Sequence, residues 1–463
     1  MADDRRPPRR RTTPPGAAIL TAVIERDEVF RIRTRRTPGT LARVLAAIGE
    51  HGAHIGEIET LSITRDHNVR DVTVIAPGDE AVDRIRAAIA ALDGVELVEQ
   101  SVDRVFAVHE GGKLVVRPSV EVQTLLDMRQ VYTPGVARVA RAIERDPALA
   151  DRYTWRRRTV AVVSDGTRVL GLGDVGPLAA LPVMEGKALF YSRLVDLNAV
   201  PIVLATTDPD EIVETIIRIA PGFGGIHLED IASPGVYDIE RALVERLDIP
   251  VLHDDQHGTA VVVLAAILSA ARLTGRPIDS MTFGQAGLGA AGSAIALLAA
   301  TLPFALVDAY DPDPEAVARF EAAAAPDSAP IRARSDVDAF DDIVGSADIL
   351  VLTTGKAGLL ARDRVRRGQV VVALTNPLPE ITIEDALAGG AAIATDGSIV
   401  NNVLGYPGLF RGALDAGASS ITAAMKRAAA EALSSLAPGD ALLPDALDRA
   451  VHAEVARRVA AAV

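Results

Sequence analysis

The chain has 463 residues, a formal net charge of −14 and no cysteine. This length exceeds one ordinary hydrophobic core, so we expect two or three domains. The lack of cysteine excludes disulfides, thiolate metal sites and cysteine nucleophiles, and it agrees with a cytoplasmic protein. The negative charge argues against a nucleic-acid-binding protein, which needs a basic face. No apolar stretch long enough to cross a membrane is free of charged residues, Gly and Pro, so we expect no membrane partner.

Residues 1–26 form an N-terminal segment rich in Arg and Pro. No apolar stretch of signal-peptide length follows it, so we interpret it as a disordered tail. Its basic residues are candidates for contact with nucleic acid or an acidic surface, but the tract is short for such a role. We expect the first domain to begin after it.

Residues 27–108 follow the pattern strand, helix, strand, strand, helix, strand. The strand-like segments alternate apolar and polar residues, and two other segments carry apolar residues at helical spacing. The first turn and helix, PGTLARVLAAIGEHGAHI, resemble those of ACT domains, which have a ferredoxin-like βαββαβ fold and bind small effectors such as amino acids. The resemblance implies a regulatory domain with a small effector, and a dimerising or spacer domain is the alternative. The helical positions are Leu41, Val44, Leu45 and Ile48 in the first segment and Val82, Ile85, Ile89 and Leu92 in the second.

Residues 109–276 mix apolar strands with helical segments and include two pairs of neighbouring carboxylates that directly follow apolar segments. Glu229 and Asp230 follow the apolar segment GGIHL, and Asp254 and Asp255 follow PVLH. Each pair is therefore expected at the end of a strand, facing one cleft. Hard carboxylate oxygens suit Mg²⁺ or Mn²⁺, and the alternative is that the pairs cap helices or face solvent. We expect an α/β domain that binds substrate and metal.

Residues 277–463 open with a strand, a glycine-rich turn, a helix and a second strand. Gly287, Gly289 and Gly292 form a G-x-G-x-x-G pattern between the first strand and the helix. In such a turn the first Gly allows the bend, the second lets backbone amides approach a pyrophosphate, and the third lets helix and strand pack closely. Further strands at α/β spacing predict a Rossmann-type dinucleotide-binding domain, followed by Ala-rich helices after Thr422. A glycine turn that binds nothing is the alternative.

An acidic residue is expected at the end of the second strand of such a domain, where it hydrogen-bonds the ribose diol of the cofactor. Asp311 lies at that interval. Its carboxylate would repel a 2′-phosphate, so the pattern favours NAD over NADP. Asp308, on the same strand, is a competing candidate.

The basic residues are almost all Arg. A position that keeps Lys in such a composition is a candidate for a base, because Arg cannot lose its proton. Asn is equally scarce. The four Lys residues are Lys113, Lys187, Lys356 and Lys426, and the five Asn residues are Asn68, Asn198, Asn376, Asn401 and Asn402.

From about His109 to Lys426 the sequence resembles the malic enzymes, particularly their shorter bacterial form. The resemblance runs through the segments YTPGVA, SDGTRVLGLGDVGP, PVMEGKA, HLEDI, HDDQHGTA, TNPLPEI and NNVLGYPGLFRGAL. It implies an α/β enzyme that oxidises and decarboxylates L-malate to pyruvate and CO₂, reduces NAD, and requires Mg²⁺ or Mn²⁺. We further expect a homo-oligomer, a dimer or larger.

The resemblance also assigns roles residue by residue. It makes Tyr132 the general acid and Lys187 the general base, with Asp254 as a supporting carboxylate beside the base. The implied metal ligands are Glu229, Asp230 and Asp255, and the implied substrate-binding residues are Arg168, Asn376 and Asn402, with Asn376 also near the nicotinamide.

The chemistry of the reaction supports these roles. Oxidation of a secondary alcohol removes its hydroxyl proton as hydride leaves, and burial lowers the pKa of a lysine, so we expect a lowered pKa for Lys187. A metal stabilises the enolate left by loss of CO₂, Tyr132 protonates the enol carbon, and Arg168 clamps a carboxylate. The alternatives are a surface ion pair for Arg168, packing for Tyr132, a turn at Asn376 and a helix cap at Asn401 and Asn402.

Three features depart from the family pattern. His227 stands where the family usually has Asn, the glycine-rich turn begins FGQAGLG, and a shortened segment, ATDGSIV, precedes Asn401 and Asn402. None of them removes an assigned catalytic residue. Two other functions stay open: another nicotinamide-linked dehydrogenase, of the amino-acid dehydrogenase type, which would need no carboxylate-bound metal, and a catalytically silent regulatory protein with an ACT-like domain.

Overall fold

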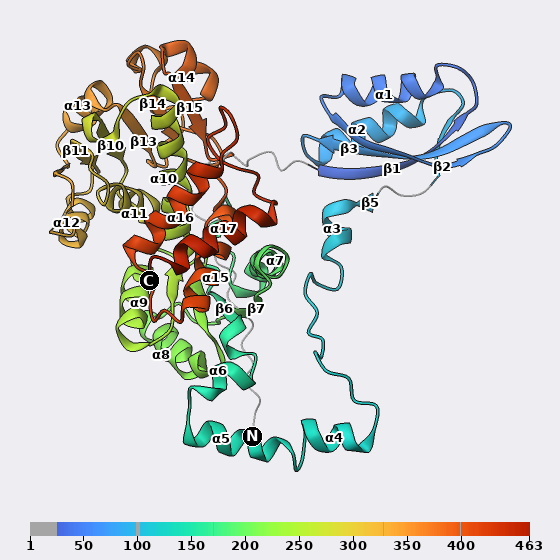
Figure 1. Ribbon diagram of the computed structural model, residues 1–463. Helices are drawn as coiled ribbons and strands as arrows, with labels where there is room; N and C mark the ends of the chain where they lie inside the picture. Colours follow the sequence, from blue (N-terminus) through green and yellow to red (C-terminus); the bar gives the residue numbers. More distant parts are fainter. Residues whose placement is uncertain (1–25, 99–101, 170, 327, 399) are drawn as a thin grey trace, which may run out of the picture. The chain divides into compact units, whose positions relative to one another are not determined.

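The computed structural model divides the chain into two compact units, Met1–Gly111 and Gly112–Val463. It describes residues 26–98 and 102–463, apart from residues 170, 327 and 399 (Figure 1). The tail predicted for residues 1–26 thus lies, but for its last residue, outside the described residues.

The first unit is an antiparallel sheet with strand order β2-β3-β1-β4 and two helices. Alternate residues of β1, including Phe30 and Ile32, are buried with one face of each helix, and β5 adds a short pairing to β1. The observed order of elements is the βαββαβ pattern that the sequence predicts. The elements are β1 (Arg26–Arg35), α1 (Thr40–Glu50), β2 (His54–Ile63), β3 (His67–Ala76), α2 (Asp79–Ala90), β4 (Val95–Leu97), β5 (Val102–Asp103) and α3 (Arg104–His109).

The second unit contains a four-stranded parallel sheet with order β7-β6-β8-β9. The central strand β6 is buried throughout, since Val160 and Val162 join one core and Ala161 and Val163 join another. Both faces are therefore covered by helices, as parallel sheets require. The elements are β6 (Thr159–Ser164), α7 (Pro177–Val195), β7 (Asn198–Val203), α8 (Pro209–Ile219), β8 (Gly225–Leu228), α9 (Gly235–Arg246), β9 (Val251–His253) and α10 (Asp254–Thr274).

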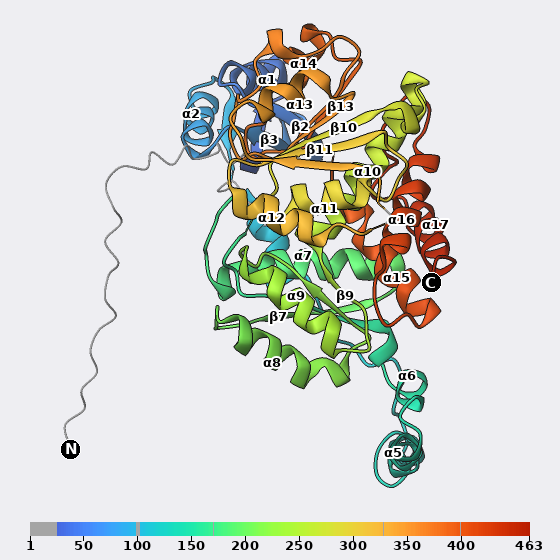
Figure 2. The same cartoon turned by 90° about the vertical axis from the view of Figure 1, so that its left-hand side faces the viewer.

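A six-stranded parallel sheet follows, with order β12-β11-β10-β13-β14-β15. Numbered within the sheet, this is the order 3-2-1-4-5-6 of dinucleotide-binding folds, which confirms the predicted Rossmann-type architecture. Figure 2 shows α11 and α12 on one face of this sheet and α13 and α14 on the other. The elements are β10 (Thr282–Ala286), α11 (Ala290–Ala299), β11 (Leu306–Tyr310), α12 (Pro314–Ala323), β12 (Ile331–Arg334), α13 (Ala339–Ser346), β13 (Ile349–Leu352), β14 (Val370–Ala373), α14 (Ile383–Gly389) and β15 (Ile393–Asp396).

Helix α10 joins the two parallel sheets. It packs against α11 and against α16, and its residues enter a core that also holds side chains of β6 and β10. The helix is long and apolar enough to cross a membrane by length and composition, but two thirds of that stretch is buried inside the protein, as expected of a core helix. The C-terminal helices that complete this core are α15 (Tyr406–Ala416), α16 (Ala423–Leu436) and α17 (Arg449–Ala460).

Residues 112–158 contain no buried residue. Helices α4 (Leu125–Val131), α5 (Val136–Arg145) and α6 (Leu149–Tyr153) lie in this stretch, and both views draw α5 apart from the sheets (Figures 1 and 2). We call residues 112–158 the arm. Exposed apolar patches of this extent mark surfaces that bind another protein, a ligand or a membrane. The large apolar residues that the arm exposes are Val115, Val116, Val120, Val122, Leu125, Leu126, Met128, Val131, Tyr132, Val136, Val139, Tyr153 and Trp155.

The separation of the cores predicts that residues 112–463 fold without residues 1–111. The core of the first unit contains only residues of that unit, and the other cores contain none of them. A chain reduced to residues 112–463 should therefore unfold in urea in one cooperative transition, at the midpoint of the larger transition of the full chain. Circular dichroism of both chains checks this, and gradual unfolding of the shortened chain would refute it.

Candidate active site

The polar residues that the sequence singles out gather at the carboxyl edge of the four-stranded sheet. Glu229 and Asp230 come directly after β8, and Asp254 and Asp255 begin α10 directly after β9, as predicted. The chain leaves β6 toward β7 on one side and returns at β8 on the other, so this edge is a topological switch point. Ligand sites of open α/β sheets lie in the crevice at such a point.

Lys187, on α7, lies between two of these carboxylates. Its Nζ is 2.6 Å from Oδ2 of Asp254 and 2.9 Å from Oε1 of Glu229, and it faces the ring of Tyr406 at 4.9 Å from the ring centre. Burial lowers the pKa of Lys187, but Asp254 and Glu229 outweigh it and hold the pKa well above its ordinary value. The expected lowering of this pKa is therefore wrong for the arrangement described here, because the two carboxylates favour the ammonium more than burial disfavours it.

The second oxygen of Glu229 is held by His227. The Nε2 atom of His227 lies 2.6 Å from Oε2 of Glu229, and Nδ1 lies 2.9 Å from the hydroxyl of Tyr191. A carboxylate can only accept, so Nε2 carries the proton and Nδ1 accepts from Tyr191. His227 is fully buried and stacks on Phe410. The sequence identifies His227 only as a departure from the family, and its contact with Glu229 is a role that sequence reasoning misses.

Glu229, Asp230 and Asp255 together form a candidate cation site. Each offers one carboxylate oxygen, and these oxygens lie within 4.8 Å of one another. Asp230 has a left-handed backbone, φ 54°, and its N–H donates to Oδ2 of Asp255 at 3.2 Å. Three hard oxygens in this arrangement fit Mg²⁺ or Mn²⁺. A second group of His227, Glu229 and Asp254 overlaps it, but Lys187 already pairs with two of its members.

The three residues predicted to bind substrate differ in their positions. The amide of Asn402 donates to Oδ2 of Asp254 at 3.3 Å and accepts from Thr259, so Asn402 belongs to the cluster. The helix-capping alternative applies to Asn401, whose side chain accepts from the N–H of Val403.

The side chains of Arg168 and Asn376 do not join the cluster around Lys187. The N–H of Arg168 donates to the carbonyl of Asp230 at 3.0 Å, and its exposed side chain forms no ion pair among the described residues, which argues against a surface ion-pair role. Asn376 precedes a cis proline, Pro377, and adjoins Gly397, where a Cβ atom would lie 3.0 Å from its amide nitrogen. Among the described residues no hydrogen bond joins either side chain to Lys187 or its carboxylates.

Tyr132 is not brought to this cluster. It follows α4 on the arm, its side chain is 69% exposed, and it makes no side-chain hydrogen bond to any residue that the structure describes. Within one chain, therefore, the predicted acid and the predicted base do not meet.

The glycine-rich turn has the geometry that the sequence predicts. Gly287 has φ 95°, and a Cβ there would lie 2.5 Å from the carbonyl of Thr353. A Cβ at Gly292 would lie 2.0 Å from the carbonyl of Gly287, so this third Gly allows the helix and the turn to approach. Gly289, in contrast, opens onto free space. An open second position at the start of α11 is what the approach of a pyrophosphate needs.

The two acidic candidates on the second strand have distinct environments. Asp311 follows β11, and its Oδ2 accepts the N–H of Leu288 in the glycine-rich turn at 2.7 Å. Asp308 is fully buried and ion-paired with Arg332 and Arg334. Asp308 therefore stabilises the sheet, and Asp311 is the carboxylate beside the cofactor turn.

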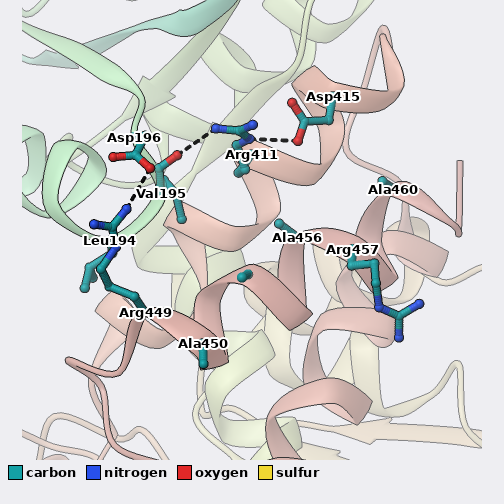
Figure 3. A pocket seen from close by; sticks show the side chains of 11 residues that line it. Leu194, Val195, Asp196, Arg411, Asp415, Arg449, Ala450, Ala456, Arg457 and Ala460 are labelled. Carbon is teal, nitrogen blue, oxygen red and sulfur yellow. Dashed lines mark hydrogen bonds and ion pairs between the residues drawn. The ribbon is translucent and has the colours of Figure 1, made fainter.

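Two cavities lie outside this site, and none of the predicted site residues lines either of them. The larger, of about 840 Å³, lies between α9, α10, α11, α12 and the start of α16. The smaller, of about 600 Å³, lies between the end of α7, α15 and α17. In the smaller cavity Arg411 pairs with Asp415 and Arg449 with Asp196, so these guanidinium groups are engaged by the protein itself (Figure 3).

Comparisons with known proteins agree with this site. Residues 113–244 match the family described as malic enzyme, N-terminal domain. The chain is 44% identical to NAD-dependent malic enzyme 1 of Bacillus subtilis (strain 168), over 92% of this chain and 95% of that protein. It is 41% identical to the NAD-dependent malic enzyme of Geobacillus stearothermophilus, over 89% and 88%. The crystal structure of the NAD-dependent malic enzyme of Thermotoga maritima matches with a TM-score of 0.70 and 35% identity, over 78% of this chain and 100% of that chain. The chain belongs to the malic enzyme family.

Proposed function

We propose that the protein is an NAD-dependent malic enzyme, which oxidises and decarboxylates L-malate to pyruvate and CO₂ while reducing NAD. The observation that carries this proposal is the cluster at the carboxyl edge of the four-stranded sheet, where Lys187 lies against Asp254 and Glu229 beside two further carboxylates. An amino-acid dehydrogenase would not need three carboxylates that converge on a cation, and a catalytically silent protein would not need a buried lysine among them.

Lys187 is the group that removes the hydroxyl proton of malate. Hydride transfer from C2 to the nicotinamide leaves a carbonyl only if that proton is taken up. Asp254 accepts hydrogen bonds from the amine of Lys187 and from the amide of Asn402. Asn402 therefore orients Asp254, and Asp254 holds the amine in place. The neutral form of Lys187 is the base, so the surroundings that favour the ammonium must change when substrate and cation bind.

Glu229, Asp230 and Asp255 are the residues that would hold the divalent cation. When bound, the cation supplies Lewis-acid stabilisation of negative charge on the substrate oxygen and competes with Lys187 for the charge of Glu229. Arg168 is a donor for a substrate carboxylate, since its side chain is exposed and its backbone adjoins Asp230. Asn376 and Asn402 supply amide donors to the substrate, and Asn376 also adjoins the nicotinamide.

Tyr132 acts from a second copy of the chain. The arm that carries it has no buried residue and exposes a row of apolar side chains, so it needs a partner surface. Of the described phenols near Lys187, Tyr191 is held by His227 and Tyr406 donates to the carbonyl of Lys187, so both hydroxyls are engaged and neither is well placed to protonate the enol carbon once CO₂ has left. A homodimer in which the arm of each chain packs against the other chain would cover the exposed apolar side chains and bring Tyr132 to the other chain's active site. Both chains gain equally, because in a two-fold interface each subunit makes the same contacts to the other.

The first unit is a regulatory domain that binds a small effector. Its ferredoxin-like sheet ends at β2, an edge strand that exposes Ile58, Leu61 and Ile63, and an edge of this kind pairs readily with a second copy. An effector changes turnover only if it binds the active and inactive arrangements with different affinity. Kinetics of the full chain and of residues 112–463 across a panel of amino acids test this role. The location that we propose, the cytoplasm, agrees with a chain that has no cysteine.

Replacing Lys187 by Arg is expected to lower kcat by about 100-fold or more, because Arg keeps the charge but cannot become a neutral base. The affinity for NAD should stay unchanged. Steady-state rates with malate and Mn²⁺, together with NAD titration by fluorescence, measure both. The matched control is Arg218→Lys, an exposed exchange on α8 that also keeps its charge. A Lys187→Arg variant that keeps more than about a tenth of the activity would exclude Lys187 as the base.

The wild type should prefer NAD, and Asp311→Ser should reduce its discrimination against NADP by about tenfold or more, the effect of removing one close charge repulsion. Ser keeps an acceptor for the N–H of Leu288. The comparison is Asp308→Ser, which should lower stability through loss of the ion pairs with Arg332 and Arg334 and leave the NAD to NADP ratio unaltered. The measurement is the ratio of kcat/KM with NAD to kcat/KM with NADP for each protein. A wild type that prefers NADP would contradict the role assigned to Asp311.

Shared active sites predict complementation between two inactive variants. Tyr132→Phe and Lys187→Arg chains, each nearly inactive as a homodimer, should regain about a quarter of wild-type activity after subunit exchange. Half of the dimers are then mixed, and each mixed dimer contains one intact site. Native mass spectrometry establishes that mixed dimers form. Mixed dimers without recovered activity would show that Tyr132 serves its own chain.

A further inference from the structure

A second polar cluster surrounds the start of α10, the helix that supplies Asp255. Glu240, on α9, and Lys426, on α16, meet His253, Gln256 and His257 around the start of α10. None of these five side chains is assigned a part in the reaction above, although His253 contacts Asp255 directly.

Glu240 is the centre of this cluster. Its Oε1 accepts the N–H of His253 at 2.8 Å, and its Oε2 accepts from Gln256 at 3.2 Å and from His257 at 3.1 Å. Burial opposes ionisation of Glu240, but His257, His253 and Lys426 bring the pKa of its carboxyl down to about 2. Glu240 is therefore a fixed anion that can only accept hydrogen bonds.

The charge of Glu240 fixes the tautomer of His257. Because Glu240 only accepts, Nε2 of His257 carries the proton, and Nδ1 of the neutral ring accepts from Lys426 at 3.0 Å. The amine of Lys426 makes no other hydrogen bond to a residue that the structure describes. Donor and acceptor are thus assigned in both hydrogen bonds that link Lys426 to Glu240 through His257.

The same logic continues from Glu240 to Asp255. The amide nitrogen of Gln256 donates one hydrogen to Glu240 and lies 2.8 Å from Nδ1 of His253. That ring nitrogen accepts, so the proton of His253 lies on Nε2, which donates to Oδ2 of Asp255 at 3.1 Å. Oδ2 of Asp255 also accepts the N–H of Asp230, so two donors set the orientation of this carboxylate.

We propose that Glu240 is a positioning residue for the cation site: Lys426 and His257 orient Glu240, and Gln256 and His253 transmit that orientation to Asp255. The inference rests on the proposed function, in which Asp255 is a metal ligand. Residues that orient a ligand in this way have a measurable effect on affinity, since their loss costs about 10- to 100-fold in metal binding or activity. Glu240 lies on a different helix from every ligand, so it acts only through His253 and Gln256.

The primary experiment is binding of Mn²⁺ to full-length Glu240→Gln, measured by electron paramagnetic resonance of free Mn²⁺ without substrate. Gln keeps the size of Glu and one acceptor for the N–H of His253, but its NH₂ group faces the donors of Gln256 and His257. The affinity for Mn²⁺ should fall by about 10- to 100-fold, while the affinity for NAD and the thermal midpoint change little. The matched control is Glu245→Gln, which removes one exposed carboxylate from the same helix and the same cavity wall and should bind Mn²⁺ like the wild type.

A second variant tests the series of hydrogen bonds from its other end, at Lys426. Lys426→Met removes the donor to Nδ1 of His257, so Glu240 alone holds the ring and their hydrogen bond becomes less well oriented, and the affinity for Mn²⁺ should fall by roughly threefold or more. In the double variant the loss should be no greater than in Glu240→Gln alone, because both changes interrupt one path. Additive losses, or wild-type affinity in both folded single variants, would overturn the proposal. If Glu240→Gln does not fold, the result for Lys426→Met alone decides.

Asp255→Asn separates this proposal from the assignment on which it depends. Wild-type affinity for Mn²⁺ in Asp255→Asn would remove Asp255 from the cation site, and the positioning role of Glu240 would fall with it. A large loss in Asp255→Asn together with wild-type affinity in Glu240→Gln and Lys426→Met would overturn the positioning role alone and leave the cation site as proposed.

Discussion

Lys187, Asp254 and Glu229 come from three different elements, and their charges can be buried only together. Removing one partner of such a group leaves an uncompensated buried charge, which typically costs about 3–5 kcal/mol. Helix α7, the end of β8 and the start of α10 must therefore meet with sub-ångström accuracy around two contacts of 2.6 and 2.9 Å. The same contacts hold the pKa of Lys187 high. The contacts that stabilise the cluster thus also favour the ammonium form of Lys187, so in the mechanism that we propose substrate and cation must alter them before the amine can act as a base.

The parallel sheet explains why these groups meet at all. The carboxyl ends of β6, β8 and β9 lie along one edge, so residues that follow each strand converge although they are far apart in sequence. Helix α10 then extends this arrangement. It begins at Asp254 and Asp255 and continues into the core shared with the dinucleotide-binding sheet, where it packs on α11. The candidate cation site and the glycine-rich turn are consequently linked by one buried helix.

Local patterns were enough to predict a large part of this protein. The alternation in β1, the helical spacing in α1 and α2, and the pattern of Gly287, Gly289 and Gly292 each depend on residues close in sequence, and the observed elements follow them. The positions of the carboxylate pairs at strand ends could be predicted for the same reason. The interval along the chain favoured Asp311 over Asp308, but the ion pairs that occupy Asp308 could not be predicted, because the two arginines that neutralise it lie on another strand.

Properties that depend on contacts between residues far apart in sequence could not be predicted from the sequence. The raised pKa of Lys187 needs Asp254, 67 residues away, at hydrogen-bond distance. The contacts of His227 with Glu229 and of Glu240 with the α10 start have no periodic signal, since each depends on a single side chain in a tertiary contact. Tyr132 differs again: its motif predicts an acid, yet one folded chain leaves it exposed on the arm. The exposed apolar arm and the position of Tyr132 outside the cluster both agree with the association of two copies that we propose. Catalysis would then depend on assembly, because a monomer would hold its base and its acid on surfaces that do not meet.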